Sequence, residues 1–226
     1  MRFQDLVCLI RSDLDRYKAT GAKSRLRVIL LYQTFWATCH FRLFTFLYSK
    51  TEKNKLFRLF VSFAYYIGFK QIQILTSISI PVGAKIGKGL YLAHFGPILI
   101  SGGTRIGDNC NLGNQVIIGY GRANNRDGHP TLGNRVFVGP GAKIFGPVKI
   151  GNDVAIGANA VVTHDIPDRA VVVGIPAEVI SYQGSFFYIK YPKRERDEEL
   201  KHSWEIACQM DPSLEGTEDL SIKPED

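Results

Sequence analysis

Histidines are the side chains of this sequence best suited to proton transfer, because imidazole titrates close to neutral pH, and three of the five lie in residues 77–180. They are His94 in LAHFG, His129 in GHPT and His164 in THD. Their spacing is not that of a metal site, which needs several converging ligands. The cysteines form no CxxC motif and predict neither zinc binding nor a disulfide framework. They are Cys8, Cys39, Cys110 and Cys208. We therefore expect acid–base chemistry without a metal, in a reducing compartment.

The elements that must position these histidines follow a six-residue period over residues 77–180. A branched apolar residue recurs every sixth position, with one two-residue slip and one longer interruption, and Gly usually follows it. The fourteen positions are Ile80, Ile86, Leu92, Ile98, Ile100, Ile106, Leu112, Ile118, Leu132, Val138, Ile144, Ile150, Ile156 and Val162. Such a hexapeptide repeat predicts triangular coils of three short strands, stacked into a parallel β-helix around one aliphatic core.

Two of the histidines lie where this repeat turns or is interrupted. His94 immediately follows a coil corner, so we expect its imidazole to project outward, with Ala93 and Phe95 keeping it neutral. The interruption at residues 119–131, GYGRANNRDGHPT, is rich in Gly, Asn and charge and ends next to His129. A solenoid tolerates such an excursion at a corner, so the pattern predicts a surface loop there.

Residues 1–76 have a different texture, apolar and aromatic with almost no Gly or Pro. Helical spacing predicts one helix from about Phe3, ended by Gly21, and two further helices over residues 25–50 and 55–75. We interpret them as a helical cap buried against the next domain or another subunit. A second interpretation is peripheral contact of this basic, aromatic region with a membrane surface.

Charge is unevenly distributed. Lys and Arg number 28 against 21 Asp and Glu, a net charge of +7; residues 197–226 hold ten acids and two bases, −8, so residues 1–196 carry +15. A basic body favours an anionic partner such as a phosphorylated cofactor or an acidic membrane, and no nucleic-acid-binding module is recognisable. The first residues are interrupted by charges too soon for a signal peptide, so we expect a cytoplasmic protein.

These features together resemble the serine acetyltransferases, which are hexapeptide acyltransferases with left-handed coils. SDLDRY followed by LLYQTFWATCHFRL resembles their helical region, and the His-Pro pair and VVVGIPAEVI resemble their β-helix. YLAHFGPILI looks closer still to capsular and exopolysaccharide O-acetyltransferases. The resemblance implies an α-helical N-terminal domain over 1–76 and a left-handed parallel β-helix over 77–180. A C-terminal extension over 181–226 is expected to be partly disordered.

The resemblance also implies the chemistry, transfer of an acetyl group from acetyl-CoA to a hydroxyl. His94 occupies the position of the family's catalytic base, and His129 that of a second histidine that holds the acceptor. Asp13 aligns with an acidic residue facing the acceptor. Gly119, at the corner that opens the interruption, is our candidate for the oxyanion N–H donor.

In the family, the pantetheine arm of the donor lies between the coils of adjacent subunits, beside small residues. The corresponding contacts here would be Pro140, Ala142, Gly157, Ala158, Thr163, His164 and Ile175. The resemblance therefore implies a homotrimer, or a dimer of trimers joined through the helical caps.

Three positions depart from the serine enzymes. Ala93 and Ser79 stand where the family has Asp, and Gly128 stands where it has an Arg for the substrate carboxylate. Because a zwitterion is held by charge-assisted hydrogen bonds, we favour a sugar hydroxyl in capsule or exopolysaccharide synthesis as the acceptor. The alternatives are serine acetylation by an altered site and a non-catalytic hexapeptide scaffold.

Overall fold

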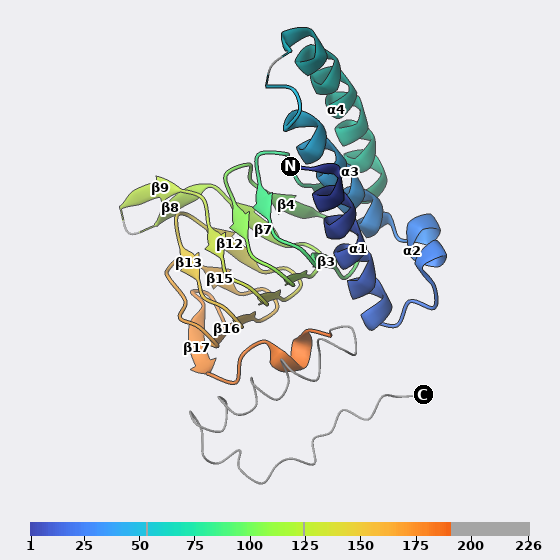
Figure 1. Cartoon of the computed structure of the whole chain (residues 1–226). Helices are drawn as coiled ribbons and strands as arrows, with labels where there is room; N and C mark the ends of the chain where they lie inside the picture. Colours follow the sequence, from blue (N-terminus) through green and yellow to red (C-terminus); the bar gives the residue numbers. More distant parts are fainter. Residues whose placement is uncertain (53, 124, 191–226) are drawn as a thin grey trace.

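The structure is a computed structural model that describes residues 1–52, 54–123 and 125–190. A helical region leads into a stack of short strands (Figure 1). The helices are α1 (Phe3–Ala19), α2 (Arg25–Leu31), α3 (Gln33–Tyr48) and α4 (Lys55–Thr76). The single helix expected over residues 25–50 is therefore wrong, because the chain breaks at Tyr32 (φ −97°, ψ 98°). Aromatic packing fixes the break: the Tyr17 ring meets Tyr32 and Phe35 edge-on.

The helices α3 and α4 pack through aromatic rings. His40 of α3 lies against the rings of Phe44, Tyr65 and Phe69. Gly68 allows this close approach, since a Cβ there would lie 2.9 Å from His40 Nε2. The helix α4 then runs directly into the first strand. Within the described part of the chain, no helix has both the length and the apolar character needed to span a bilayer.

The strands form three parallel sheets, one on each side of a triangular coil. Sheet A contains β1 (Ile78–Ser79), β4 (Ile98–Ile100), β7 (Ile117–Gly119), β12 (Lys143–Phe145) and β15 (Val161–Val162). Sheet B contains β2 (Lys85–Ile86), β5 (Arg105–Ile106), β10 (Thr131–Leu132) and β13 (Lys149–Ile150). Sheet C contains β3 (Tyr91–Leu92), β6 (Asn111–Leu112), β11 (Phe137–Val138), β14 (Ala155–Ile156), β16 (Val171–Val173) and the antiparallel β17 (Glu178–Ser181). The predicted helical region followed by hexapeptide sheets of parallel strands is confirmed.

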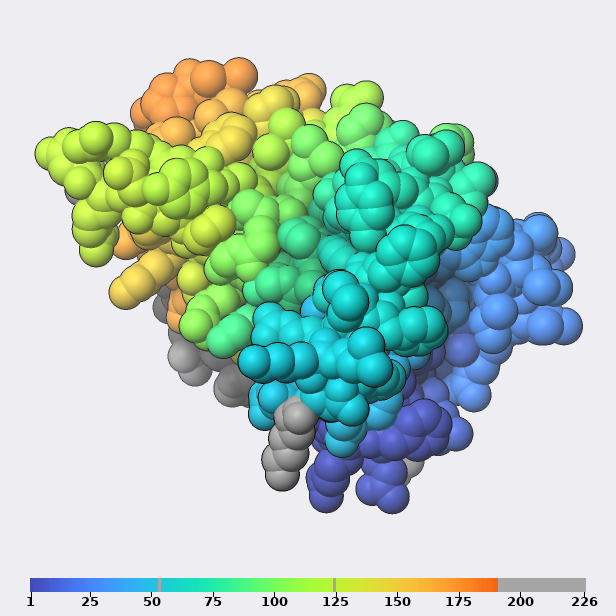
Figure 2. All heavy atoms as spheres, turned by 90° about the horizontal axis from the view of Figure 1, so that it is seen from above, coloured from blue at the N-terminus to red at the C-terminus, as the bar shows by residue number. Residues whose placement is uncertain are grey.

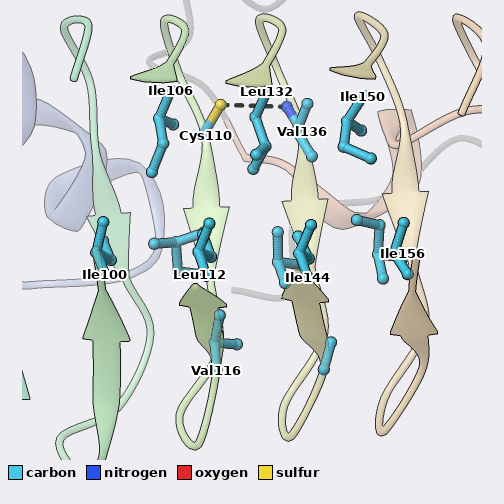
Figure 3. Close-up of a cluster of buried hydrophobic side chains, with 14 of the residues drawn as sticks. Ile100, Ile106, Cys110, Leu112, Val116, Leu132, Val136, Ile144, Ile150 and Ile156 are labelled. Atoms are coloured by element: carbon cyan, nitrogen blue, oxygen red, sulfur yellow. Dashed lines mark hydrogen bonds between the residues drawn. The ribbon is translucent and has the colours of Figure 1, made fainter. Parts of the chain in front are cut away.

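Two rows of apolar side chains fill the coil (Figure 3). The first is the predicted six-residue row, buried except for half-buried Ile86. The second row, two residues earlier in each repeat, was not predicted; it includes Cys110, Val116, Val136, Ala142, Val148 and Val154. Ile98 belongs to this second row, which explains the two-residue slip: β4 presents both Ile98 and Ile100 to the core.

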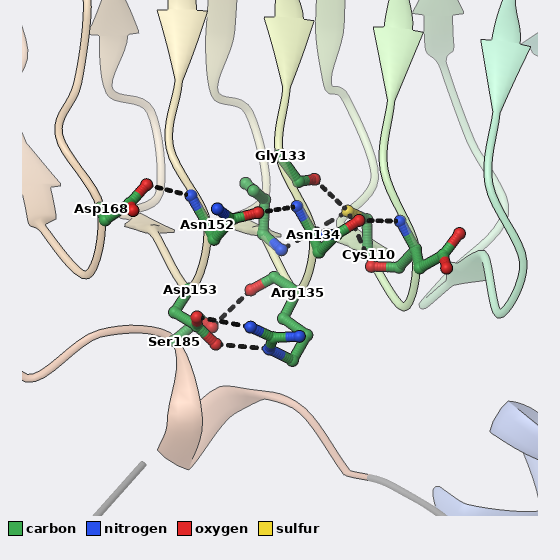
Figure 4. Close-up of polar contacts among 10 residues, drawn as sticks. Cys110, Gly133, Asn134, Arg135, Asn152, Asp153, Asp168 and Ser185 are labelled. Carbon is green, nitrogen blue, oxygen red and sulfur yellow. Dashed lines mark hydrogen bonds and ion pairs between the residues drawn. The ribbon is translucent and has the colours of Figure 1, made fainter. Parts of the chain in front are cut away.

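The corners of the coil are named here by the sheets they join. At the C–A corner Gly is required, because a Cβ on Gly113 would lie 2.7 Å from the Pro140 nitrogen of the next coil. The B–C corner carries a polar ladder (Figure 4). In it Asn134, Asn152 and Asp168 each accept a backbone N–H from the preceding coil at 2.7–2.9 Å. These contacts hold successive coils in register.

The interruption at residues 119–131 is not an irregular loop. It contains an antiparallel hairpin of β8 (Gly121–Ala123) and β9 (Arg126–Gly128) that projects from the A–B corner (Figure 1). After β17 the chain crosses sheet C, where Tyr188 in the short helix η1 (Phe186–Tyr188) stacks on Phe137 at 4.8 Å between ring centroids. The predicted disordered extension lies outside the described residues beyond residue 190.

Candidate active site

His94 lies on the C–A corner between β3 and β4, and its side chain is exposed. This corner is longer than the others of its kind: Leu92 and Ile100 are eight residues apart, whereas Leu112 and Ile118 are six apart. The Gly96 N–H donates to the Thr76 carbonyl at 3.2 Å, which ties the corner to the end of α4. Phe95 is 68% exposed and therefore does not enclose the imidazole as expected.

His129 lies on the A–B corner at the foot of the hairpin, half-buried. Its Nδ1 is 2.8 Å from Ser101 Oγ, which in turn is 2.9 Å from Thr104 Oγ1. The ring also meets Tyr120 edge-on at 5.1 Å. The imidazole packs directly on Gly103, and a Cβ added to this glycine would lie 2.2 Å from the ring. Because Nδ1 is engaged, Nε2 is the nitrogen left to meet a ligand.

Sequence reasoning missed the partners Ser101, Thr104 and Tyr120. A signal for the two corners was present, since His94 and His129 lie at the two places where the six-residue period is broken. Because three repeats make one coil, counting the repeats in threes assigns His94 to the C–A corner and His129 to the A–B corner. The SGGT run at residues 101–104 occupies the equivalent A–B corner one coil earlier, which is why it meets His129.

The two histidines do not meet within one chain. They lie at opposite ends of the strands of sheet A, because β4 runs from the corner that carries His94 to Ser101, which is hydrogen-bonded to His129. From Pro97 to Ser101 the strand extends four residues, about 13 Å at 3.3 Å per residue. One chain therefore presents two half-sites, one at each end of these strands.

The predicted donor-binding residues lie in two groups, one at each end of the strands of sheet A. Pro140, Gly157 and Ala158 lie on the C–A corner in the coils beyond His94, and Ile175 lies in the turn between β16 and β17 of sheet C. Thr163 and His164 lie on the A–B corner, and Gly119 ends β7 at that corner. Ala142 is completely buried, so its side chain contacts the core and not a ligand. Pro140, Ala158 and Ile175 are exposed, and the first two leave the backbone of the C–A corner accessible.

Asp13 lies at neither corner. It is fully buried and paired with Arg42 of α3, with Nε–Oδ2 at 2.9 Å. The Leu90 N–H donates to Asp13 Oδ1 at 2.8 Å, and Arg42 donates to the carbonyls of Ile86 and Gly87. Burial raises the pKa of Asp13, and the guanidinium of Arg42 opposes that shift. The predicted acceptor contact is therefore wrong: Asp13 fastens α1 and α3 to the first coil.

The positions that depart from the serine enzymes carry no charge near either histidine. Ser79 Oγ accepts a hydrogen bond from Gln73 Nε2 at 3.1 Å, and Ala93 is partly buried. The exposed charges closest in sequence to His129 are Arg126 and Asp127 of the hairpin. Among the described residues, no three His, Cys, Asp or Glu side chains gather as a metal site would require.

Comparison with known proteins identifies relatives along most of the chain. A family model described as bacterial transferase hexapeptide (six repeats) matches residues 129–164. The serine acetyltransferase of Helicobacter pylori strain J99 is 37% identical over 164 residues, which are 71% of this chain and 89% of that protein. The enzyme of Mycobacterium tuberculosis is 43% identical over 108 residues, 48% of this chain and 47% of that protein.

Solved structures of the serine acetyltransferase of Brucella abortus strain S19 share the fold. One has a TM-score of 0.68 at 26% identity and covers 81% of this chain and 72% of that chain. Another, a complex with coenzyme A, has a TM-score of 0.65 at 25% identity and covers 79% of this chain and 69% of that chain.

A hexapeptide β-helix behind a helical region, with histidines on exposed corners, defines the chain as a hexapeptide-repeat acyltransferase. The identity over most of the H. pylori enzyme places it more narrowly, and the chain belongs to the serine acetyltransferase family. The closer likeness expected to capsular and exopolysaccharide O-acetyltransferases finds no support in these relatives.

Proposed function

We propose that the protein transfers the acetyl group of acetyl-CoA to the hydroxyl of serine. The observation that carries this proposal is the 37% identity to a serine acetyltransferase over 89% of that enzyme's length. Acetyl-CoA as donor is supported by the complex of the B. abortus relative with coenzyme A. The C–A corner, exposed at Pro140 and Ala158 and half-buried at Gly157, fits a long, thin ligand, because small side chains let it approach.

In the proposed reaction His94 is the general base. Its free imidazole nitrogen takes the hydroxyl proton while the oxygen attacks the thioester carbonyl carbon. The tetrahedral intermediate then expels the thiolate as the carbon–sulfur bond breaks, and the imidazolium returns the proton to sulfur. His129 holds the acceptor through Nε2, with Ser101 fixing the ring. The Gly119 N–H remains our candidate donor to the oxyanion.

The opposite placement of the two histidines supports a homotrimer. If each copy turns sheet A toward a common three-fold axis, the C–A corner of one copy meets the A–B corner of the next. His94, Pro140 and Ala158 would then face His129, Thr163 and His164 of a neighbour, and the donor would lie between them. Sheet C is unsuited to this contact because residues 182–190 already cover it. Left-handed coils, the 1–76 and 77–180 domain division and a dimer of trimers remain predictions, as does a cytoplasmic location.

A second candidate acceptor is a neutral sugar hydroxyl. The observation that favours it is the absence of charge at Ser79, Ala93 and Gly128. A zwitterionic acceptor loses charge-assisted hydrogen bonds in such a site, and a sugar does not need them.

The two acceptors are separated by measuring CoA release with the purified full chain. We expect L-serine to give the higher kcat/KM when tested beside nucleotide sugars and oligosaccharides. If the hydroxyl oxygen is the acetylated atom, O-acetylserine must be the first product. N-acetylserine can form from it and must therefore appear no faster. A sugar preferred over serine would establish the second candidate, and release no faster than with water alone would refute acetyl transfer to either.

A further inference from the structure

The helix α4 has a large apolar face that no other part of the described chain covers. Its seven bulky side chains are 42–80% exposed and recur at spacings of three, four and seven residues: Leu56, Leu59, Phe60, Phe63, Tyr66, Ile67 and Ile74. We call these residues the α4 outer face. The opposite side of α4 packs inward through Val61, Tyr65 and Thr76. Figure 2 looks onto the cyan-to-teal side chains of this helix, which spread over the near surface. Isolated apolar side chains on a surface are ordinary, but a continuous face of this size marks an interaction surface.

The surroundings of this face are basic. Lys55, Arg58 and Lys70 of α4 are exposed, and α4 contains no acid. Lys70 Nζ lies 5.9 Å from the centre of the Tyr66 ring, so its stem follows the apolar face while its ammonium group reaches water. Over residues 17–76 the sequence has ten Lys and Arg and a single acid, Glu52.

The positions of two of these charges are unfavourable for the helix itself. Lys55 and Arg58 occupy the first turn of α4, where the helix dipole favours acids and disfavours cations. No acid in that turn offsets them. Neither residue has an ion pair among those of the described chain. Within the described residues nothing offsets these two charges, and an anionic partner would.

We propose that the α4 outer face docks on the surface of a membrane that contains anionic phospholipids. The helix would lie parallel to the bilayer, with Leu59, Phe60 and Phe63 inserted at the acyl boundary. Lys55 and Lys70 would meet the phosphate groups, as in other amphipathic helices of this composition. A second copy is a poorer occupant, because two such faces packed together would bring their cations together with no acid on α4 between them. The proposal does not depend on the acetyl acceptor.

The experiment is flotation of the full chain with two kinds of vesicle. One kind is phosphatidylcholine alone, and the other is phosphatidylcholine with phosphatidylglycerol in a three-to-one ratio. We expect binding to the anionic vesicles that weakens with added salt. Lys55→Gln with Lys70→Gln should weaken it about 30-fold, since each basic side chain at an anionic surface contributes about fivefold. The matched control is Lys85→Gln with Arg105→Gln, which removes two exposed charges from sheet B and should change nothing.

The apolar contribution is tested by Leu59→Ser with Phe63→Ser, which should reduce binding at least tenfold at every salt concentration. Both side chains are exposed, so circular dichroism should show an unchanged fold. No binding of the unaltered chain to anionic vesicles overturns the proposal. So does equal loss in the sheet B control. A lower oligomeric mass of the Leu59→Ser, Phe63→Ser variant with unchanged vesicle binding would assign the face to a second copy instead.

Discussion

Replacing Asp13 by Ala is expected to destabilise the whole protein and not to act on the acceptor. The change leaves the guanidinium of Arg42, 3% exposed, without its counter-charge, and leaves the Leu90 N–H without its acceptor. Arg42 keeps only its bonds to the carbonyls of Ile86 and Gly87. Removing one partner of a buried ion pair costs about 3–5 kcal/mol. This is a large share of the total stability of an ordinary domain, about 5–15 kcal/mol.

The chain offers a matched control on the same helix. Asp15 pairs with Arg25 at 2.7 Å, but the two side chains are 36% and 56% exposed. Asp15→Ala should therefore cost no more than about 1 kcal/mol. Replacing both buried partners, Asp13→Ala with Arg42→Met, should recover much of the lost stability, because no unpaired charge then remains buried.

The assay is urea unfolding followed by circular dichroism, with steady-state kinetics below the transition. Asp13→Ala should lower the midpoint strongly while the folded fraction keeps the KM of the unaltered chain for its acceptor. If Asp13→Ala has the same urea midpoint as Asp15→Ala and instead raises the KM for the acceptor, Asp13 contacts the acceptor and the structural role assigned to it is wrong.

Three further changes have defined outcomes. His94→Ala should lower kcat by about 10²- to 10⁴-fold with little change in the KM for acetyl-CoA, whereas His129→Ala should mainly raise the acceptor KM; the reverse pattern would exchange their roles. Ser101→Ala should lower kcat/KM for the acceptor by freeing the His129 ring, and Ser101→Thr should restore it if the hydroxyl is what matters. Burial among aromatic rings lowers the pKa of His40 to about 4 from 6.5, so the unfolded chain takes up the proton first. The stabilising contribution is complete above about pH 6.5 and is lost as the pH falls toward 4; in urea titrations His40→Leu should be less sensitive over this interval, and an identical dependence would show that His40 does not titrate there.

The six-residue period predicted the β-helix because each aliphatic residue of the period fills one side of the coil. The same period did not reveal the second buried row, since residues such as Ala142 and Val116 vary in size and type. Ala142 belongs to this row, so a contact of the donor with this residue would involve its main chain. The break at Tyr32 depends on packing against Tyr17, a contact that local helical spacing does not encode.

The sequence proposes the residues of the candidate site but does not give their arrangement. His94 and His129 are identifiable by type and by resemblance, but their separation depends on which corner each repeat turns. The partner of Asp13 is Arg42, 29 positions away and without a shared motif, so only the folded chain reveals the pair. Ser101 is 28 positions from His129 and becomes its neighbour only because coils stack.

We propose that His94 of one copy and His129 of another serve a single acyl-transfer site. This proposal is tested most directly by mixing His94→Ala and His129→Ala chains in equal amounts, unfolding and refolding them together, and measuring CoA release. In a randomly mixed trimer about a quarter of the interfaces join an intact His94 to an intact His129, so activity should return to about a quarter of that of the unaltered chain. Mixed samples no more active than the two variants alone would contradict a site shared between copies.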